Sequence, residues 1–333
     1  MEFGIWYSNV TDSRKEELTE FVKSIILEDK IMLLSLNGDA SFRKYYRVEG
    51  KGLIAVDSPP ETQKNREFVA VNGALVRLGI LVPNIVSVDY EKGFMLINDL
   101  GDRTFGQVAV GKEQERYYKA AIDILAQMTR VDIELPAFDE QFIRTELGLF
   151  ETWTIEKYFK TQFRAVEKLL FENATKIMLS VCEAQPQVPM HRDYHSRNLM
   201  VFEDDRLAVI DYQDMVKGPL LYDLASLLFD CYVELDGELI ESLKHYAYDL
   251  YTAKNILTNT DYDTFNYQLT VTSLQRHIKV IGIFCRLSIR DGKNNYLKDI
   301  PRVVRYALRE CGISREFKGL KSILEKYVAG RIR

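Results

Sequence analysis

The sequence predicts an α+β fold with two lobes: a small lobe with an antiparallel sheet plus a helix, and a large lobe that is mainly helical. Two observations support this fold class. Before residue 98, five short apolar or β-branched runs are bounded by turn residues, whereas after about residue 101 apolar residues recur mostly at helical spacing. The chain of 333 residues, 47% hydrophobic, also exceeds the usual size of one compact domain. We therefore expect lobes at residues 1–98 and 99–333.

The first lobe is predicted to begin with a helix. Ser13 to Glu16 has the form of a capping box, and apolar residues follow at helical spacing as far as Ile26. Residues 61–78 predict a second helix that ends at Gly79, a residue suited to a left-handed helix end. The runs that predict strands cover residues 31–36, 45–48, 53–56, 85–90 and 94–97.

The most informative stretch of the chain runs from His191 to Asn198 and continues at Asp211, 13 positions after Asn198. Asp193, Asn198 and Asp211 have the spacing that holds a catalytic base and two magnesium ligands around a nucleoside triphosphate in kinases. Asp193 would accept the proton of an acceptor hydroxyl. Asn198 and Asp211 would offer the hard oxygen ligands that Mg²⁺ prefers. The pattern predicts phosphoryl transfer, with ATP and Mg²⁺ expected.

The interval between the two predicted metal ligands supports this interpretation. Residues 199–202 and 206–210 are apolar runs around the polar turn 203–205, which is typical of two strands joined by a hairpin. A hairpin brings its two ends together, so Asn198 and Asp211 would share metal ions despite their separation in sequence.

Four further stretches, residues 38–48, 56–61, 146–150 and 274–284, carry a resemblance to a known family together with this motif. The sequence resembles the aminoglycoside phosphotransferase and choline kinase superfamily, which has the protein-kinase-like fold. Within it, the chain is similar to bacterial kinases that phosphorylate N-acetylmuramate and N-acetylglucosamine at the anomeric hydroxyl. The resemblance implies an ATP-dependent sugar kinase of cell-wall recycling. It also implies that Asp223 is buried and braces the catalytic loop, and that His191 is structural.

The segment after Asp211 distinguishes substrate classes. Protein kinases place a long activation segment there, which forms the platform for a peptide. Here Gly218 and Pro219 arrive seven residues after Asp211, and an apolar helix with Tyr222 and Asp223 begins at once. This spacing leaves no room for a peptide platform and favours a small-molecule acceptor.

Two features concern the nucleotide. The turn 37–46 lies between the first two strands, where the backbone N–H groups of residues 40–42 would cradle phosphate oxygens. An ordinary hairpin turn is the alternative, because Gly38 is its only glycine. Asp57 stands at the strand position where protein kinases carry a phosphate-binding lysine, and Glu67 in the next helix then lacks that partner. The residues predicted to contact the nucleotide are Ala40, Ser41, Phe42, Arg43 and Lys44.

The acceptor site is expected in the large lobe. Between residues 274 and 290 one helical face gathers Arg276, Lys279, Arg286 and Arg290. A solvated face is one interpretation of such a stripe. If the stripe faces the cleft, it suits an anionic acceptor, such as a sugar with a lactyl carboxylate.

Two other residues are candidates for contact with a sugar. Trp153 would stack on a sugar face, although an isolated tryptophan is more often part of the core. Glu146 would bond sugar hydroxyls or cap its own helix.

Two other functions remain open from the sequence. A kinase for aminoglycosides or other amino alcohols predicts acids around the acceptor, with Asp214, Glu234 and Asp236 as candidates. A pseudokinase that binds nucleotide as a regulatory module is suggested only by the missing lysine at Asp57.

Composition excludes some other classes. The net charge of −5 argues against a general nucleic-acid binder, which needs a basic footprint. No uncharged apolar run approaches the length of a membrane span, and no obligatory protein partner is indicated. Four scattered cysteines without metal or redox spacing predict buried, reduced thiols in a cytoplasmic protein: Cys182, Cys231, Cys285 and Cys311.

Overall fold

The computed structural model describes residues 3–36, 43–202 and 204–332, with side chains described from Ser13 onward. The chain divides into two compact units. The small unit comprises Met1–Arg103 and Met200–Asp214, and the large unit comprises Thr104–Leu199 and Met215–Arg333. The predicted α+β class, with one antiparallel sheet and a mainly helical remainder, is confirmed.

The small unit is built on a five-stranded antiparallel sheet in the order β1-β2-β3-β5-β4. Each of the five predicted strands is present within about two residues of its expected bounds. The strands are β1 Leu33–Ser35, β2 Lys44–Val48, β3 Leu53–Asp57, β4 Ile85–Asp89 and β5 Phe94–Asn98.

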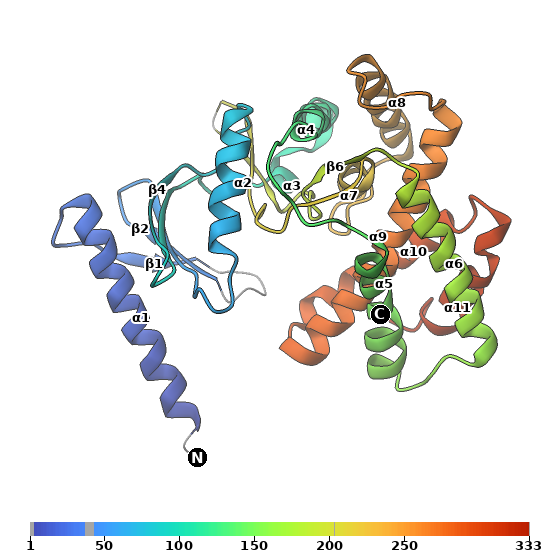
Figure 1. Ribbon diagram of the computed structural model, residues 1–333. Coiled ribbons are helices and arrows are strands. Elements are labelled where there is room, and N and C mark those ends of the chain that lie inside the picture. Colours follow the sequence, from blue (N-terminus) through green and yellow to red (C-terminus); the bar gives the residue numbers. More distant parts are fainter. Residues whose placement is uncertain (1–2, 37–42, 203, 333) are drawn as a thin grey trace. The chain divides into compact units, whose positions relative to one another are not determined.

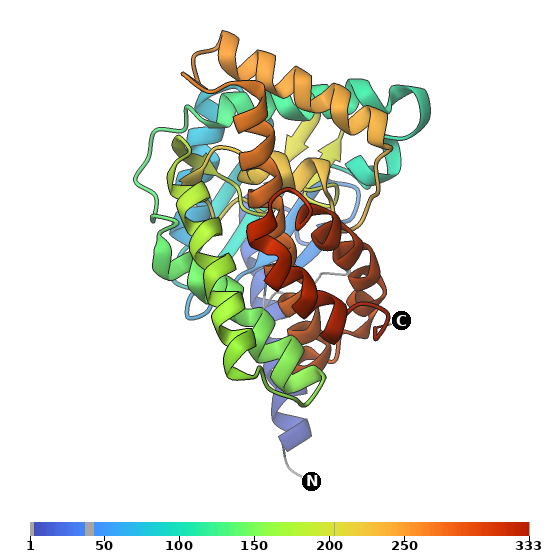
Figure 2. The same cartoon turned by 90° about the vertical axis from the view of Figure 1, so that its right-hand side faces the viewer.

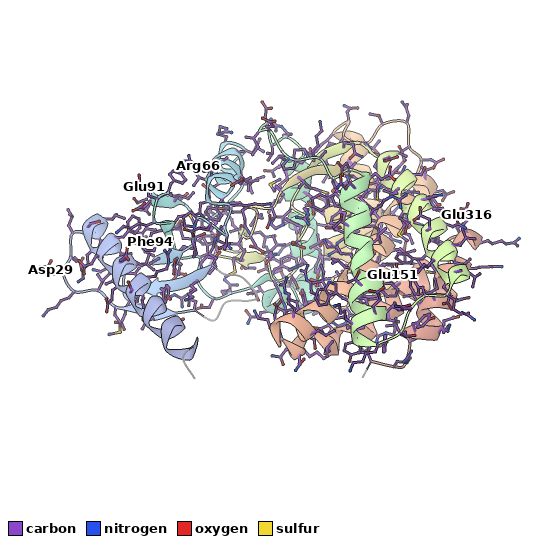
Figure 3. The ribbon with its side chains drawn as sticks, turned by 60° about the horizontal axis from the view of Figure 1, so that its bottom comes forward. Asp29, Arg66, Glu91, Phe94, Glu151 and Glu316 are labelled. Carbon is purple, nitrogen blue, oxygen red and sulfur yellow. The ribbon has the colours of Figure 1, made fainter. Side chains whose placement is uncertain are left out.

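The two faces of this sheet are covered by different helices, α1 (Phe3–Ile26) and α2 (Asn65–Arg77), as Figure 1 shows. On the α1 face, Leu18 and Val22 pack with Ala55, Phe94 and other strand residues in a buried cluster. The ring of Phe94, labelled in Figure 3, lies 5.9 Å from that of Phe21 in α1. Alternate residues of each strand therefore face different environments.

Both helices of the small unit begin elsewhere than predicted. α1 begins at Phe3, so Ser13 lies inside it and the predicted capping box at Ser13 is wrong. Residues 3–12 contain no proline, and nothing in them prevents a helix from extending back past Ser13. α2 begins at Asn65 rather than 61, because the N–H groups of Thr62 and Gln63 bond the Pro59 carbonyl in a turn. Gly79 adopts the expected left-handed conformation, with φ of 75°.

The predicted hairpin is present as β7 (Leu199–Val201) and β8 (Leu207–Val209). Most of it packs with the small unit, whereas the expected division placed all of 99–333 in one lobe. Hydrogen bonds of 2.8 Å join Val201 N to the Arg103 carbonyl and Val209 N to the Leu81 carbonyl. Tyr212 stacks on Phe68 of α2. The small unit is therefore assembled from two separate pieces of sequence.

The large unit is mainly helical, and the long helix α9 (Tyr262–Asp291) runs through its core. Figure 2 shows α9 in orange between α6 and the C-terminal helices. The strands β6 (Gln187–Met190) and β9 (Val216–Pro219) pair antiparallel. The other helices are α3 Phe105–Val108, α4 Gln114–Met128, α5 Glu140–Leu149, α6 Ala165–Glu183, α7 Tyr222–Leu228, α8 Gly237–Ala253, α10 Ile300–Glu310 and α11 Lys318–Tyr327. The short helices are η1 Gly111–Glu113, the π-helix η2 Phe150–Tyr158, η3 Asn294–Asp299 and η4 Arg315–Phe317.

Gly282 lies where α9 crosses the end of α5 closely within the large unit. A Cβ atom at this position would lie 2.5 Å from the carbonyl carbon of Leu149 and 2.7 Å from the nitrogen of Phe150. The π-helix η2 begins at this crossing. Only a glycine lets the two backbones approach so closely.

Two general expectations can be compared with the structure. All four cysteines are free and buried. Among the helices of the described residues, none combines the length and apolar character that a membrane span requires.

Candidate active site

In the large unit, the residues of the predicted motif lie on the 191–198 loop, which follows β6 directly. Its first two backbone N–H groups, those of His191 and Arg192, donate to the carboxylate of Asp223 in α7; the Arg192 bond is 2.9 Å. His191 and Asp223 are both buried. Arg192 has φ of 77°, which a non-glycine residue adopts only when its surroundings hold it there. The start of the loop is therefore fixed in a strained conformation.

Hydrogen bonds within the loop connect Asp193 to Asn198. The side-chain amide of Asn198 donates to the Asp193 carbonyl at 2.9 Å, and the backbone N–H of His195 donates to the same oxygen at 3.1 Å. The amide nitrogen of Asn198 is thus engaged within the loop.

Sequence reasoning missed the residue that fixes the second half of the loop. Asp230, which is buried, accepts hydrogen bonds from the backbone N–H groups of Ser196 at 2.8 Å and Tyr232 at 2.7 Å. Asp230 follows an apolar helix and has no characteristic spacing from the motif. The only available signal in the sequence was an acid directly after a mostly apolar run.

The electrostatic environment keeps Asp193 ionised. Burial by itself raises the pKa of the Asp193 carboxyl, but neighbouring positive charges, that of Lys279 foremost and then those of His195 and Arg192, bring it down to about 2. Asp193 is thus an anion throughout the neutral range, and its carboxylate is a weak base.

Two predicted acceptor residues, Glu146 and Lys279, lie together in a buried ion cluster. Glu146 Oε1 lies 3.0 Å from Lys279 Nζ and 2.9 Å from Arg192 Nη2. Lys279 also donates to the Tyr222 hydroxyl at 2.9 Å. Glu146 does not cap its own helix, because Asp139 accepts from the N–H group of Phe142 at the start of α5. The cluster instead connects α5 and α9 to the residue before Asp193.

The basic stripe of α9 divides into buried and exposed parts. Arg276 is 3% exposed and Lys279 is 5% exposed, so a solvated face is wrong for both. Arg290 is exposed and pairs with the adjacent Asp291 at 2.7 Å.

The remaining acceptor candidates lie in other environments. Trp153, in the π-helix η2, is half-buried and packs against the core of the large unit. Asp214 belongs to the small unit and pairs with Lys64 at 2.7 Å. The other acids that an amino-alcohol kinase would use are also engaged: Glu234 lies 2.9 Å from Arg305, and Asp236 caps α8.

In the small unit, Asp211 follows β8 by two residues and has φ of 64°. The Gln213 side chain donates to its carboxylate at 2.8 Å. In the part of the chain that the structure describes, no group of three or more His, Cys, Asp or Glu side chains forms a metal site. Any metal held by Asp211 therefore needs other kinds of ligand.

Asp57 faces away from α2, so it does not take the place of the phosphate-binding lysine. Its carboxylate accepts from Arg14 of α1, with Nε at 3.0 Å. Strand residues alternate between faces, and the sequence did not reveal which face Asp57 would take. Lys44 lies opposite Asp57 in the register of β2 and β3, with an exposed side chain on the α1 face. The α2 helix carries Glu67, whose side chain is exposed.

Arg43 instead lies on the α2 face of the sheet. Its Nε donates to the Ser58 hydroxyl at 2.9 Å, and its guanidinium carbon lies 5.1 Å from the centre of the Phe68 ring in α2. Burial raises the pKa of the neighbouring Tyr45, Arg43 opposes that rise, and Asp211 adds to it. Arg43 and Asp211 therefore both act on the hydroxyl of Tyr45. The predicted phosphate contacts Ala40, Ser41 and Phe42 lie outside the described residues.

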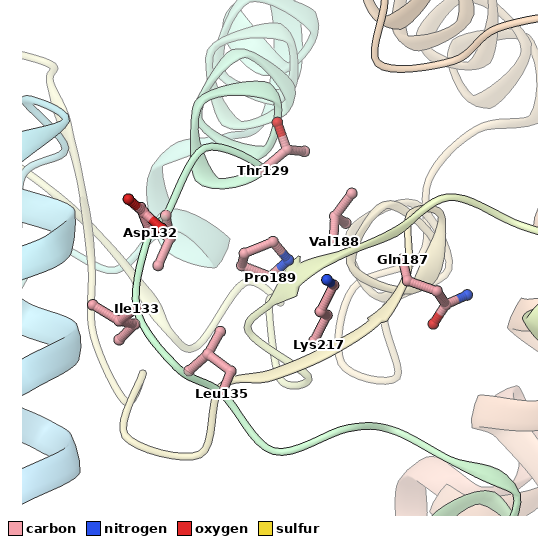
Figure 4. Close-up of a pocket in the computed structure, with 9 residues that line it drawn as sticks. Thr129, Asp132, Ile133, Leu135, Gln187, Val188, Pro189 and Lys217 are labelled. Carbon is pink, nitrogen blue, oxygen red and sulfur yellow. The ribbon is translucent and has the colours of Figure 1, made fainter.

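A separate cavity of about 280 Å³ opens beside β6. Figure 4 shows Asp132, Ile133 and Leu135 from the segment after α4 facing Pro189 of β6 and Lys217 of β9. None of the predicted site residues lines it.

The chain is similar in sequence to known phosphotransferases. A family model described as the phosphotransferase enzyme family matches residues 33–254. An N-acetylmuramate/N-acetylglucosamine kinase of Pseudomonas putida is 33% identical over 302 residues, which cover 90% of this chain and 89% of that protein. An enzyme of the same name from Neisseria meningitidis is 31% identical. The aligned residues cover 95% of this chain and 96% of that enzyme.

Solved structures extend the comparison to the fold. A choline/ethanolamine kinase family protein from Mesorhizobium loti has a TM-score of 0.62 at 12% identity, covering 93% of this chain and 99% of its own. The ADP-bound aminoglycoside phosphotransferase APH(2'')-Ib has a TM-score of 0.60 at 14% identity, covering 87% and 97%. At these identities the two structures show that the fold is shared.

Proposed function

Because this chain belongs to the phosphotransferase enzyme family, we propose that it transfers the γ-phosphoryl group of ATP to the anomeric hydroxyl of N-acetylmuramate or N-acetylglucosamine. The reaction would be a step of cell-wall recycling in the cytoplasm and would need no protein partner. The observation that carries the proposal is the 191–198 loop, where Asp193 and Asn198 are joined by a hydrogen bond in a chain similar to amino-sugar kinases along nearly its whole length.

Asp193 would be the general base. The acceptor oxygen forms a new bond to the γ-phosphorus, the bond from that phosphorus to the bridging oxygen breaks, ADP leaves, and the hydroxyl proton passes to Asp193. An anomeric hydroxyl is more acidic than an ordinary alcohol, so a weakly basic carboxylate suffices for this acceptor.

Asn198 and Asp211 would hold Mg²⁺, which neutralises charge on the phosphate oxygens when it is bound. The chemistry of these two side chains fits the ion. Asn198 carries an amide oxygen and its amide nitrogen is engaged within the loop, and Asp211 carries a carboxylate on a residue with a positive φ. An amide oxygen and one carboxylate leave room for phosphate oxygens and water, which Mg²⁺ usually retains.

Arg43 would supply the cation that protein kinases take from their strand lysine. It lies on the α2 face of the sheet, and its charge and that of Asp211 reach the same tyrosine hydroxyl. We expect Arg43→Met to raise the KM for ATP roughly 10-fold, the effect of losing one charged hydrogen bond. Lys44→Met, on the opposite face, is the matched control and should leave that KM unchanged. Equal effects of the two variants would remove this role from Arg43.

Glu146 and Lys279 would act on the acceptor site through Arg192 and Asp193, because their charges already neutralise each other. The structure gives no support to an aminoglycoside or amino-alcohol acceptor, because the three candidate acids already form ion pairs or a helix cap. These acids are Asp214, Glu234 and Asp236. Trp153 as a stacking surface for the sugar stays a prediction.

The test is an ADP-release assay with Mg²⁺-ATP and four acceptors: N-acetylmuramate, N-acetylglucosamine, kanamycin and choline. We expect turnover with the amino sugars alone. Turnover with kanamycin or choline only would make the enzyme an amino-alcohol kinase. Nucleotide binding without turnover on any acceptor would favour a regulatory module. Asp211→Ala should abolish binding of Mg²⁺-ATP in calorimetry.

A further inference from the structure

Arg276 is a buried cation of the large unit that has no hydrogen-bond partner for much of its charged group. Within the described residues, neither its Nε nor its Nη1 has a partner, and both atoms are shielded from solvent. Its guanidinium lies 5.6 Å from the centre of the Tyr222 ring. Burial opposes its charge, yet nearby acidic groups, Asp193 and Asp230 among them, keep its pKa above the ordinary value. Arg276 is thus charged and close to the proposed base.

The buried carboxylates around the 191–198 loop are already bonded elsewhere. Glu146 binds two other cations. Asp223 and Asp230 accept from backbone N–H groups with both of their oxygens. None of these acids forms an ion pair with Arg276, whereas Lys279, one turn further along α9, has Glu146 at 3.0 Å. Lys279 thus has a carboxylate as its ion-pair partner, and Arg276 has none among these acids.

An unpaired buried guanidinium is costly. Leaving a buried charge without a partner destabilises the fold, and a bound molecule that pairs with the charge offsets this penalty. Arginine presents a planar fork of donors that matches a carboxylate with two parallel hydrogen bonds. A neutral hydroxyl offers neither the charge nor the two acceptors. The chemistry of this position therefore suits an anion with a carboxylate.

We propose that Arg276 binds the carboxylate of the acceptor sugar and thereby makes the enzyme prefer N-acetylmuramate over N-acetylglucosamine. The inference rests on the proposed function, since the lactyl ether that carries the carboxylate is what distinguishes these two sugars. Arg276 is accordingly a specificity-determining residue, and Lys279 is its paired counterpart that positions the loop.

The test compares kcat/KM for both sugars in wild type, Arg276→Gln and Arg276→Lys, with Arg290→Gln as the matched control on the same helix. Loss of a charged, two-pronged contact predicts a roughly 10- to 100-fold rise in KM for N-acetylmuramate in Arg276→Gln. The KM for N-acetylglucosamine and kcat for both sugars should stay within about 2-fold. Arg276→Lys keeps the charge but loses the fork, and we expect an intermediate effect on N-acetylmuramate alone.

A direct binding measurement separates recognition from turnover. Calorimetry with Asp193→Asn and with Asp193→Asn/Arg276→Gln should show weaker binding of N-acetylmuramate in the double variant and equal binding of N-acetylglucosamine. Equal losses of affinity for both sugars would mean that Arg276 only supports the loop. Unchanged affinity for both sugars would mean that water, not the sugar, binds the Arg276 guanidinium. Either result overturns the proposal. If Arg276→Gln does not fold, Arg276→Lys decides by the same comparison. Absence of turnover with either sugar in wild type would instead refute the proposed function.

Discussion

The part of α9 from Val271 to Gly282 is buried along its whole length, polar side chains included, whereas the part after Gly282 carries the exposed Arg290 near its end. Arg276 and Lys279 lie in the first part, among the acids and aromatic rings around the 191–198 loop. Arg290 lies in the second part and pairs with its sequence neighbour Asp291. In sequence these residues form one continuous stripe. The comparison teaches that helical spacing reports which residues share a face but not how deeply each part of that face is buried.

The largest expected effect concerns Asp193, which the buried part of α9 keeps ionised. Asp193→Asn removes the carboxylate base but preserves the shape of the side chain. We expect kcat to fall roughly 10²- to 10⁴-fold, the usual contribution of a general base, while ATP binding is retained. Steady-state ADP release and calorimetry with Mg²⁺-ATP measure the two quantities. Near-normal turnover would remove Asp193 from the role of base.

The next effect concerns the ion cluster itself. Glu146→Gln leaves Arg192 and Lys279 without their carboxylate, and losing one partner of a buried pair costs about 3–5 kcal/mol of unfolding free energy. Glu140→Gln, on the exposed side of the same helix, removes a surface pair with Arg144 and should cost about 0–1 kcal/mol. Urea unfolding followed by circular dichroism compares them. Equal losses would mean that the cluster contributes no more than a surface pair.

The same variant has a pH signature with a defined sign. Burial raises the pKa of the Glu146 carboxyl, but Lys279 and Arg192 lower it further, so that the folded value lies below the ordinary value of 4.5. A carboxyl whose pKa is lower in the folded protein than in the unfolded chain stabilises the fold fully at pH values above its pKa in the unfolded chain. That contribution is lost as the pH falls through the pKa of the folded state. The difference in unfolding free energy between wild type and Glu146→Gln should therefore be constant at neutral pH and shrink below about pH 4.5. A difference that grows with acidification would contradict the assigned sign.

A smaller effect is expected at the boundary between the two parts of α9. Gly282→Ala forces a methyl group against the backbone at Leu149 and Phe150, and such overpacking costs about 1–3 kcal/mol. Gly148→Ala in α5 is the matched control, because a Cβ there meets nothing within 4 Å, and it should be neutral or stabilising by up to about 1 kcal/mol. Denaturant midpoints measure both. A tolerated Gly282→Ala would show that the crossing has room to relax.

The smallest effect is expected at Arg290. Arg290→Gln removes an exposed pair with Asp291 and should change the unfolding free energy by less than about 0.5 kcal/mol. It should also leave the KM of both sugars unchanged. A clear rise in either KM would extend the functional surface of α9 past Gly282.

Local features of the small unit could be predicted from sequence because they depend on neighbouring residues. Turn residues delimited every strand, and Gly79 marked the end of α2. The face taken by Asp57 could not be predicted, because a strand's phase becomes known only from its pairing with other strands. In the large unit, Arg192 and Glu146 are 46 residues apart, so their contact follows from helix packing alone. For the same reason the motif revealed Asp193 and Asn198 but gave no indication of Asp230.

The assembly of the small unit from two pieces of sequence has a consequence for the order in which the chain can fold. Residues 200–214 contribute Val209, which bonds Leu81, and Tyr212, which packs on Phe68. A ribosome releases these residues only after Thr104–Leu199, the first segment of the large unit, has been synthesised. Until then the nascent sheet lacks the segment that carries Asp211. The small unit is therefore completed late in translation, and a fragment ending at Arg103 would lack part of its own packing.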